Sequence, residues 1–269
     1  MSKKIILVMS VLCLFACLMT ACSKNKPNSP DISTPNESQT SEKTDEIINE
    51  NDVNIEMEED EKGEEMQFIY GATSSKEKIE SGNPETGDVV ICNGYEYTYN
   101  IILVDQYTTM PSDMNGWSVH SVDKERKVAE GIKDELFGIP VKSMNYCYKG
   151  SEQLESVKSI PKYIESAVGA FESCAKLIEC CELPASLSDA RNMFAYCTSL
   201  KTAPQLINTL KAIDKMFYYC RALTGHIDIP DSIETFNGLF DKTAETITIA
   251  GKDDIVETIT REYWNVSKK

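Results

Sequence analysis

A sequence repeat with a period of 23 runs from Met144 to about Gly251 and restricts the folds that this chain can adopt. Six positions in each unit hold one residue type or close relatives. The aromatic position is filled by Tyr148, Phe171, Phe194, Phe217 and Phe240, the cysteine position by Cys174, Cys197 and Cys220, and the first leucine position by Leu154, Leu177, Leu200 and Leu223. A period of roughly 20 to 50 residues indicates a solenoid, a propeller or an array of small units.

One unit is too short to enclose a core, so the units are expected to stack and to share a core with their neighbours. In the unit from Ala190 to Leu210, we expect a short strand from Leu200 to Leu206, with Phe194 filling the inside from the opposite wall. A proline position follows the strand and ends it, because proline cannot donate to a sheet ladder. This position is filled by Pro161, Pro184, Ile207 and Pro230.

The unit resembles the BspA-type leucine-rich repeat of bacterial surface proteins. The resemblance rests on Ala167-x-x-x-Phe171-x-x-Cys174-x-x-Leu177, followed by Leu183-Pro184 and Leu187, and it covers residues 87 to 250. It implies a leucine-rich-repeat array with short parallel strands. Many proteins of that family are exported and attached to the cell surface, and some are implicated in adhesion. Ser151 and Thr243 replace cysteine in the first and last units, which are therefore expected to be atypical.

The predicted fold class is an α+β solenoid with a small β-rich N-terminal cap and a helical C-terminal cap. We divide the chain into five segments. These are a lipoprotein signal peptide at 1–22, a disordered acidic tether at 23–66, a β-hairpin-rich cap module with a helix at 67–143, the repeats at 144–251 and a capping helix at 252–269.

The segment 1–22 has the pattern of a secretion signal. Two lysines precede an apolar run from Ile5 to Ala16, and Leu18–Cys22 resembles a lipobox. Such a motif implies that Cys22 receives a lipid and becomes the new N-terminus, which would attach the protein to the bacterial cell membrane on its outer, surface-exposed side. A simple signal peptide and an uncleaved anchor are the alternatives, although the apolar run is short for a membrane span. Leu14–Cys17 is a second, poorer candidate for the lipidation site.

Residues 23–66 lack apolar periodicity, and their second half is dense in carboxylates, including Glu58–Glu61. Like charges repel and no core can form, so we expect a disordered tether that holds the folded part away from the membrane. A calcium site is the alternative, but the alternating oxygen ligands of a calcium loop are missing. The net charge of −16 argues against nucleic acid as a partner.

The segment before the repeats predicts a small sheet. Asn93-Gly94 separates two β-rich runs and indicates a hairpin, and Trp117–Val122 is a candidate third strand. Tyr95, Tyr97 and Tyr99 share one face of their strand and could form a sugar-stacking platform, but packing in a half-buried sheet is the favoured interpretation. Val128, Ile132 and Leu136 follow at helical spacing and predict a helix that Gly138 ends.

The end of the chain predicts a short helix after Gly251. Asp253 or Asp254 can cap its N-terminus. Its apolar residues are then expected to face the last repeat. They are Ile255, Ile259 and Tyr263, with Trp264 beside them.

The cysteines allow more than one interpretation. Seven follow Cys22, an odd number, so at least one thiol stays free or pairs between chains. The three in repeat register are predicted to be buried, apolar and reduced. Cys180 and Cys181 could bind a metal with His226, but their spacing matches no zinc signature, and we predict no metal site.

We predict that the chain is not an enzyme and uses no cofactor. His120 and His226 are its two histidines, and no nucleophile motif surrounds a cysteine. Phosphate-loop and dinucleotide-binding motifs are missing as well. A cysteine-dependent enzyme that uses Cys181 and His226 is a remote alternative.

The expected role is recognition of a protein or glycan at the cell surface, with a spacer or envelope-structure role as the alternative. Side chains that point out of stacked strands form a continuous face, and such faces bind ligands in solenoids. The candidates lie between the leucine and proline positions: Lys158, Glu179, Glu182, Lys201, Gln205 and Asp228.

Overall fold

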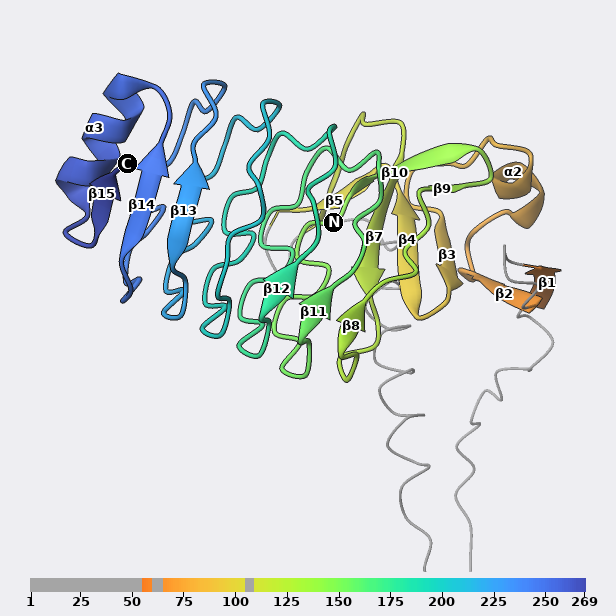
Figure 1. Ribbon diagram of the computed structural model, residues 1–269. Helices are drawn as coiled ribbons and strands as arrows, with labels where there is room; N and C mark the ends of the chain where they lie inside the picture. The colour runs from red at the N-terminus through yellow and green to blue at the C-terminus, as the bar shows by residue number, and fades with distance from the viewer. Residues whose placement is uncertain (1–54, 60–64, 105–108) are drawn as a thin grey trace, which may run out of the picture. The chain divides into compact units, whose positions relative to one another are not determined.

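The computed structural model describes residues 55–59, 65–104 and 109–269. They form a sheet of seven strands, followed by an array of repeat units that ends in a helix (Figure 1). The predicted signal peptide, the predicted lipidation residue Cys22 and most of the predicted tether lie outside the described residues. The described helices, α2 and α3, both fall short of the length and apolar character that a membrane crossing requires.

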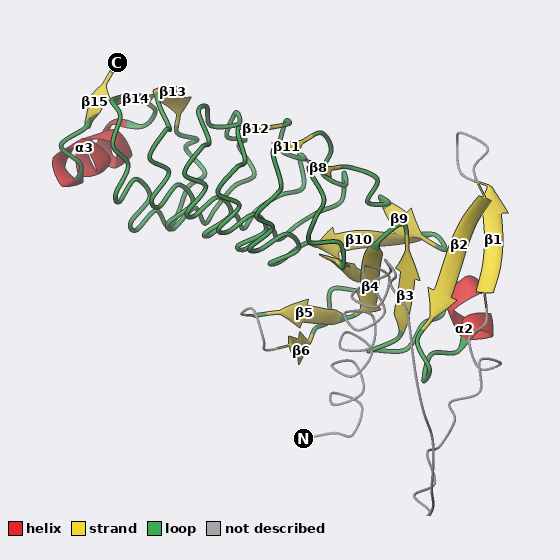
Figure 2. Ribbon diagram, turned by 90° about the horizontal axis from the view of Figure 1, so that it is seen from below, coloured by secondary structure: helices red, strands yellow, loops and turns green. Residues whose placement is uncertain are grey.

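The sheet has the strand order β1-β2-β3-β4-β7-β10-β9. All neighbouring strands in it are antiparallel except β7 and β10. Figure 2 shows it with the helix α2 and the small hairpin β5–β6. The elements are β1 (Ile55–Glu59), β2 (Glu65–Tyr70), α2 (Lys76–Glu80), β3 (Val89–Cys92), β4 (Tyr95–Tyr99), β5 (Ile101–Leu103), β6 (Thr109–Pro111), β7 (Trp117–Ser121), β9 (Glu135–Leu136) and β10 (Ile139–Ser143).

The predicted hairpin and third strand are present. Asn93 and Gly94 connect β3 to β4 with φ angles of 52° and 76°, the left-handed pair that a tight two-residue hairpin needs. Strand β7 then pairs with β4, so that Tyr97 lies opposite Val119. The turn therefore sets the register of β3 against β4, whereas β7 reaches β4 over a longer connection.

Two expectations for this part were wrong. The tether was predicted to be disordered to residue 66, but β1 and the start of β2 pair with each other within that range. The segment from Ile55 to Glu59 alternates apolar and acidic residues, which is a strand pattern despite its charge.

The predicted helix through Val128, Ile132 and Leu136 is also wrong. Val128 begins the two-residue strand β8 (Val128–Ala129), and Leu136 pairs with Ile139 across a tight turn. Gly131 interrupts the segment with a φ of 82°. The helical spacing is incidental, because Val128 lies half-buried beside the buried Ala129 in β8, whereas Leu136 is buried in β9.

The array contains a row of short parallel strands along one side (Figure 1). The strand β11 (Ser156–Val157) lies between β8 and β12 (Glu179–Cys180). Farther along the chain, β14 (Ile247–Ala250) lies between β13 (Gly225–Asp228) and β15 (Val266–Lys268). These strands confirm the predicted solenoid with parallel strands.

The expected strand at Leu200–Leu206 is missing from this row, and Pro204 explains why. In the preceding units, the amide of Lys158 donates to the Ala129 carbonyl and the amide of Cys181 donates to the Val157 carbonyl, both at 2.9 Å. Pro204 occupies the same position one repeat after Cys181 and has no amide hydrogen. The ladder survives three residues earlier in the unit, where the amide of Lys201 donates to the Ile178 carbonyl.

A second set of contacts joins the units on another side. Parallel bridges recur once per unit through Ser143, Ser166, Asp189, Ala212 and Thr235. The turns that follow also donate from each unit to the next. The amides of Tyr148, Phe171, Phe194 and Phe217 bond the carbonyls of Ala170, Met193, Met216 and Leu239 at 2.8, 2.9, 3.0 and 3.2 Å.

The repeated aromatic residues form the centre of the array core. The rings of Tyr148, Phe171, Phe194, Phe217 and Phe240 stack in that order, with centroids 5.4 to 6.0 Å apart and interplanar angles of at most 13°. All five side chains are buried. The stack ends on the ring edge of Tyr263, at 89° to Phe240. Packing is therefore the role of the aromatic position.

The repeated cysteines lie beside this stack as free, buried thiols. The Sγ atoms of Cys174, Cys197 and Cys220 donate to the carbonyls of Tyr148, Phe171 and Phe194 at 3.1 to 3.2 Å. Each thiol thus satisfies a carbonyl in the preceding unit while filling a small apolar space.

The helix α3 (Asp253–Glu262) follows the last unit and buries Ile255 and Ile259, as expected. Two details differ from the prediction. The N-cap residue is Lys252, which makes no side-chain capping bond, and both aspartates lie in the first turn. Trp264 points outward and is 88% exposed, because the chain turns after Tyr263 to add β15 to the sheet.

Candidate functional site

The six candidate residues of the predicted ligand face lie outside the core. They belong to different rows of the array, where a row is the set of residues that hold the same position in successive units. Glu182, Gln205 and Asp228 hold the same position in successive units and form one row. Lys201 belongs to a second row, with Glu155 and Ile178 two units and one unit earlier. The remaining two candidates, Lys158 and Glu179, each lie in a further row. The structure thus brings three of the six into register.

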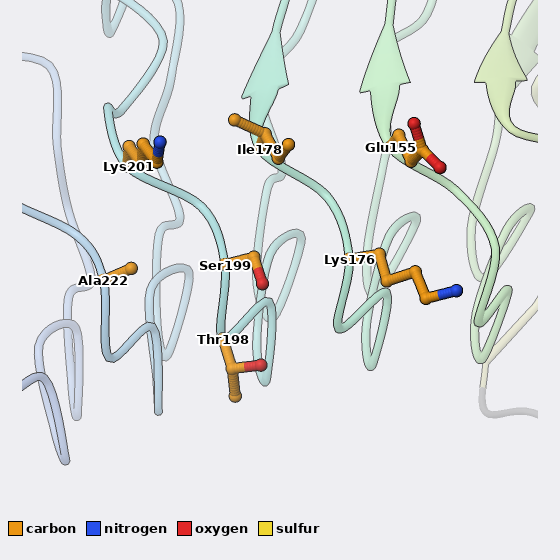
Figure 3. A pocket seen from close by; sticks show the side chains of 7 residues that line it. All are labelled: Glu155, Lys176, Ile178, Thr198, Ser199, Lys201 and Ala222. Carbon is orange, nitrogen blue, oxygen red and sulfur yellow. The ribbon is translucent and has the colours of Figure 1, made fainter.

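A shallow, open depression crosses the second row. It is lined by Glu155, Lys176, Ile178, Thr198, Ser199, Lys201 and Ala222. Figure 3 shows Glu155, Ile178 and Lys201 side by side on neighbouring units. Ile178 is 42% exposed, which is unusual for its size in this array. The depression therefore combines an apolar floor with charges of both signs.

The second histidine lies on the strand side of the array. His226 contacts the Thr248 hydroxyl through Nδ1 and the Asp228 carboxylate through Nε2, both at 3.1 Å. These contacts connect the outward faces of β13 and β14. The arrangement orders surface side chains, and its three residues are not among those that line the depression.

The turns on the aromatic side of the array carry two rows of left-handed residues. The first row is Tyr146, Gly169, Asn192, Lys215 and Gly238, and the second is Gly150, Ser173, Tyr196, Tyr219 and Lys242. Their φ angles lie between 54° and 71°. This is the region that glycine adopts freely and that bulky residues avoid. The repeat imposes the conformation, whatever side chain the sequence places there.

Three tyrosines from two of these turns form what we call the tyrosine cluster: Tyr196, Tyr218 and Tyr219. The ring of Tyr196 lies 5.1 Å from Tyr218 at 72° and 5.5 Å from Tyr219 at 38°, between centroids. Tyr196 is 42% exposed, and the other two are half-buried. The sequence prediction missed this cluster, although Tyr196 and Tyr219 are one repeat apart with Tyr218 adjacent.

Two cations lie against the tyrosine cluster. The guanidinium of Arg221 is 4.3 Å from the ring centroid of Tyr219 and donates to its hydroxyl. The ammonium of Lys215 is 6.0 Å from the centroid of Tyr218. Neither cation forms an ion pair with a carboxylate of the described residues. The cluster therefore has an aromatic centre and a positive edge.

The predicted tyrosine stripe of the N-terminal sheet is packing, as favoured. Tyr95 and Tyr97 have no exposed surface, and Tyr99 packs on Trp117 with centroids 5.4 Å apart. The hydroxyl of Tyr97 accepts a bond from the amide of Lys133. Tyr95 and Tyr97 cannot stack on a sugar, because neither side chain is exposed.

The two adjacent thiols at Cys180 and Cys181 are half-buried and free. A hydrogen bond between them raises the pKa of Cys180, which burial raises further, and lowers the pKa of Cys181. The described residues contain no group of three or more His, Cys, Asp or Glu side chains that could hold a metal ion. The structure therefore does not bring His226 to the two cysteines as a metal site.

A comparison with protein families agrees with the repeat. Residues 141–244 match the family model of the BspA type leucine rich repeat region, in six copies. Among solved structures, the chain is similar to the crystal structure of a T. pallidum leucine-rich repeat protein. That match has 20% sequence identity and a TM-score of 0.42, and it covers 56% of this chain and 68% of that one. No curated protein matches the sequence.

Proposed function

Residues 141–244 form a BspA-type leucine-rich repeat region, and from this we propose that the protein recognises a protein or glycan at the outer surface of a cell. Arrays of this kind act by binding, because their stacked units present long, continuous surfaces. The protein would be exported and held by a lipid on Cys22. No catalytic step is assigned to it.

The observation that carries the proposal is the contrast between neighbouring rows of the array. The row of Leu183, Leu206 and Ile229 is buried and keeps its apolar character from unit to unit. The adjacent outward row changes from acidic Glu182 to neutral Gln205. Packing fixes the buried row and leaves the outward one free to match a ligand, which supports recognition on this side.

Both ends of the array are covered by other parts of the chain. This supports a binding surface on the long side of the array. At the start, Trp117 and Tyr95 pack into the same core as the first units. At the other end, Ile255 and Ile259 of α3 and the ring of Tyr263 cover the last ones. We assign cap roles to these two parts, because an open solenoid end exposes core and unpaired strand edges.

A binding experiment tests the ligand face directly. Immobilised protein is screened against extracts of cell-surface proteins and glycans, and bound material is titrated against variants Lys201→Glu and Glu182→Lys. We expect weaker binding at an unchanged melting temperature, because both side chains are exposed. Arg261→Glu, an exposed charge on α3, is the matched control. A spacer role without a ligand predicts that nothing is retained.

Anchoring has its own test. Cys22→Ala should move the protein from the membrane fraction to the medium or the periplasmic fraction, since the lipid would have no thiol to join. Mass spectrometry of the mature wild-type N-terminus should show a lipid-modified cysteine. A variant that still sediments with membranes, together with an unmodified wild-type N-terminus, would exclude the lipoprotein assignment.

A further inference from the structure

Tyr196 occupies a backbone position that suits glycine. Its φ is 64°, and the same position in the first unit is Gly150 with a φ of 71°. A bulky side chain at such an angle is a strained outlier, and the repeat imposes the angle here as it does along the rest of the row. Burial does not offset the strain, because the ring is 42% exposed.

The neighbouring rings contact Tyr196 and leave the residue 42% exposed. Tyr218 meets it edge-on at 5.1 Å, and Tyr219 lies tilted at 5.5 Å. A fixed, half-exposed aromatic ring is suited to stack on the C–H face of a sugar ring, since the face of the aromatic ring carries partial negative charge. Rigid rings also lose little entropy on binding.

The charges at the cluster specify the sugar further. Arg221 and Lys215 lie against Tyr219 and Tyr218, and neither pairs with a carboxylate of the described residues. On the adjoining turn, the carboxylate of Glu172 is paired with Lys149 at 2.9 Å. In a chain with a net charge of −16, two such cations beside an exposed ring suit a carboxylate ligand.

We infer that the tyrosine cluster binds an oligosaccharide that carries carboxylate groups. Tyr196 provides the stacking surface, and Arg221 and Lys215 bind the carboxylates. This inference rests on the proposed function, because it names one ligand class for the same array. It places the site on the turn side, whereas the residues predicted from the sequence lie on the strand side.

The test uses calorimetry with the full-length protein in detergent and three probes. Oligogalacturonate supplies uronic acids, sialyllactose supplies a sialic acid, and maltohexaose is a neutral control. We expect an acidic probe to bind at least tenfold more tightly than maltohexaose, and more weakly as salt rises. Which acidic probe binds identifies the carboxylate source.

Tyr196→Gly is the decisive variant, because it removes the ring and relieves the backbone. We expect at least a tenfold loss of affinity at an unchanged or higher melting temperature. Arg221→Gln should lose a similar factor for the acidic probe. Tyr163→Ala should bind as wild type does, since Tyr163 is an exposed tyrosine with a cation 4.7 Å from its ring that lies outside the tyrosine cluster.

Three results would overturn the inference. One is equal affinity of Tyr196→Gly and wild type, and another is equally tight binding of the neutral sugar. The third is a lower melting temperature for Tyr196→Gly, which would make the ring a structural element. Retention of a protein ligand that depends on Lys201 and not on Tyr196 would reject this site and leave the proposed function standing. Failure to retain any ligand would reject both.

Discussion

The hydroxyl of Tyr95 lies 2.7 Å from the hydroxyl of Tyr148, and their rings meet edge to face at 83°. Tyr95 belongs to the N-terminal sheet, and Tyr148 is the first ring of the aromatic stack. The Tyr95 hydroxyl also contacts the carbonyl of Glu130 at 2.7 Å. Tyr95 therefore donates to that carbonyl and accepts from Tyr148, which joins sheet and array by a directed chain of two bonds.

This direction predicts that the two hydroxyls are not equivalent. Tyr148→Phe removes one donor and leaves Tyr95 bonded to Glu130, so it should cost about 1 kcal/mol of unfolding free energy. Tyr95→Phe leaves the buried Tyr148 hydroxyl and the Glu130 carbonyl without this partner and should cost about 2 to 3 kcal/mol. Urea unfolding measures both values. Equal costs would show that the bonds do not form a chain.

The middle of the aromatic stack should be the most sensitive point of the array. Phe194 has a ring on each side, at 5.5 and 5.9 Å, and no exposed surface. Phe194→Ala removes both contacts and leaves a cavity, so it should cost roughly 3 to 5 kcal/mol. The matched control is Lys201→Ala, which changes an exposed side chain later in the same unit. It should alter the free energy of unfolding by no more than about 0.5 kcal/mol. Similar urea midpoints for the two variants would contradict the stack as the core.

The repeat cysteines should react very slowly with iodoacetamide in the native protein. Burial raises the pKa of Cys174 and of Cys220 to about 12, and neither thiol is exposed. Cys181 is half-buried and has a lowered pKa, so it should be labelled first. Peptide mass spectrometry after labelling at pH 8, with and without urea, measures the order. A Cys174–Cys197 disulfide in the native protein would disprove the packing role.

A buried carboxyl in the N-terminal sheet should make stability depend on pH. Burial raises the pKa of Glu96 to about 7, against 4.5 for an exposed glutamate. Between these values the folded state binds more protons than the unfolded state, so the contribution of Glu96 falls as pH rises. The loss is complete about one pH unit above 7 and corresponds to roughly 3 kcal/mol.

Glu96→Gln isolates this contribution. Relative to wild type, the variant should gain stability from pH 5 to pH 8, when both are unfolded with urea at each pH. Taking the difference removes the effect of other groups, such as His120 on the opposite strand, whose pKa burial lowers to about 4. A constant difference across this range would mean that the carboxyl is hydrated in the folded state.

The array could be predicted from the sequence because its packing is periodic. Each ring from Tyr148 to Phe240 meets the same surroundings, so one residue type satisfies every unit. The exceptions follow from backbone chemistry that composition does not reveal. Pro204 looks like one more proline of the repeat, yet it stands before the proline position, which Ile207 fills, and removes the amide that a strand there would use.

The N-terminal sheet was harder to predict because its contacts do not repeat. Val128 and Leu136 have helical spacing, but they lie in two short strands that pair with different partners, β11 and β10, and only this pairing reveals the strands. The strand at Ile55–Glu59 was missed because its alternating pattern is only five residues long and lies within a carboxylate-rich stretch. Short apolar segments carry too little information to separate these cases.

The candidate site was also predicted only in part from the sequence. The common row of Glu182, Gln205 and Asp228 followed from the period, as did its outward direction. The tyrosine cluster did not follow, because its significance depends on the φ angles of Tyr196 and Tyr219, which the sequence does not state. Gly150 in the same position was the available signal that this row requires a left-handed backbone.

The left-handed rows also constrain how such a chain can change length during evolution. A gain or loss of one complete unit places every later residue on a backbone it already fits, so duplication within the gene is tolerated. An insertion of a single residue between Gly150 and Lys242 would instead move a neighbouring side chain onto each later left-handed position at once. The array is thus expected to vary among related genes in number of units, with the length of the unit nearly constant.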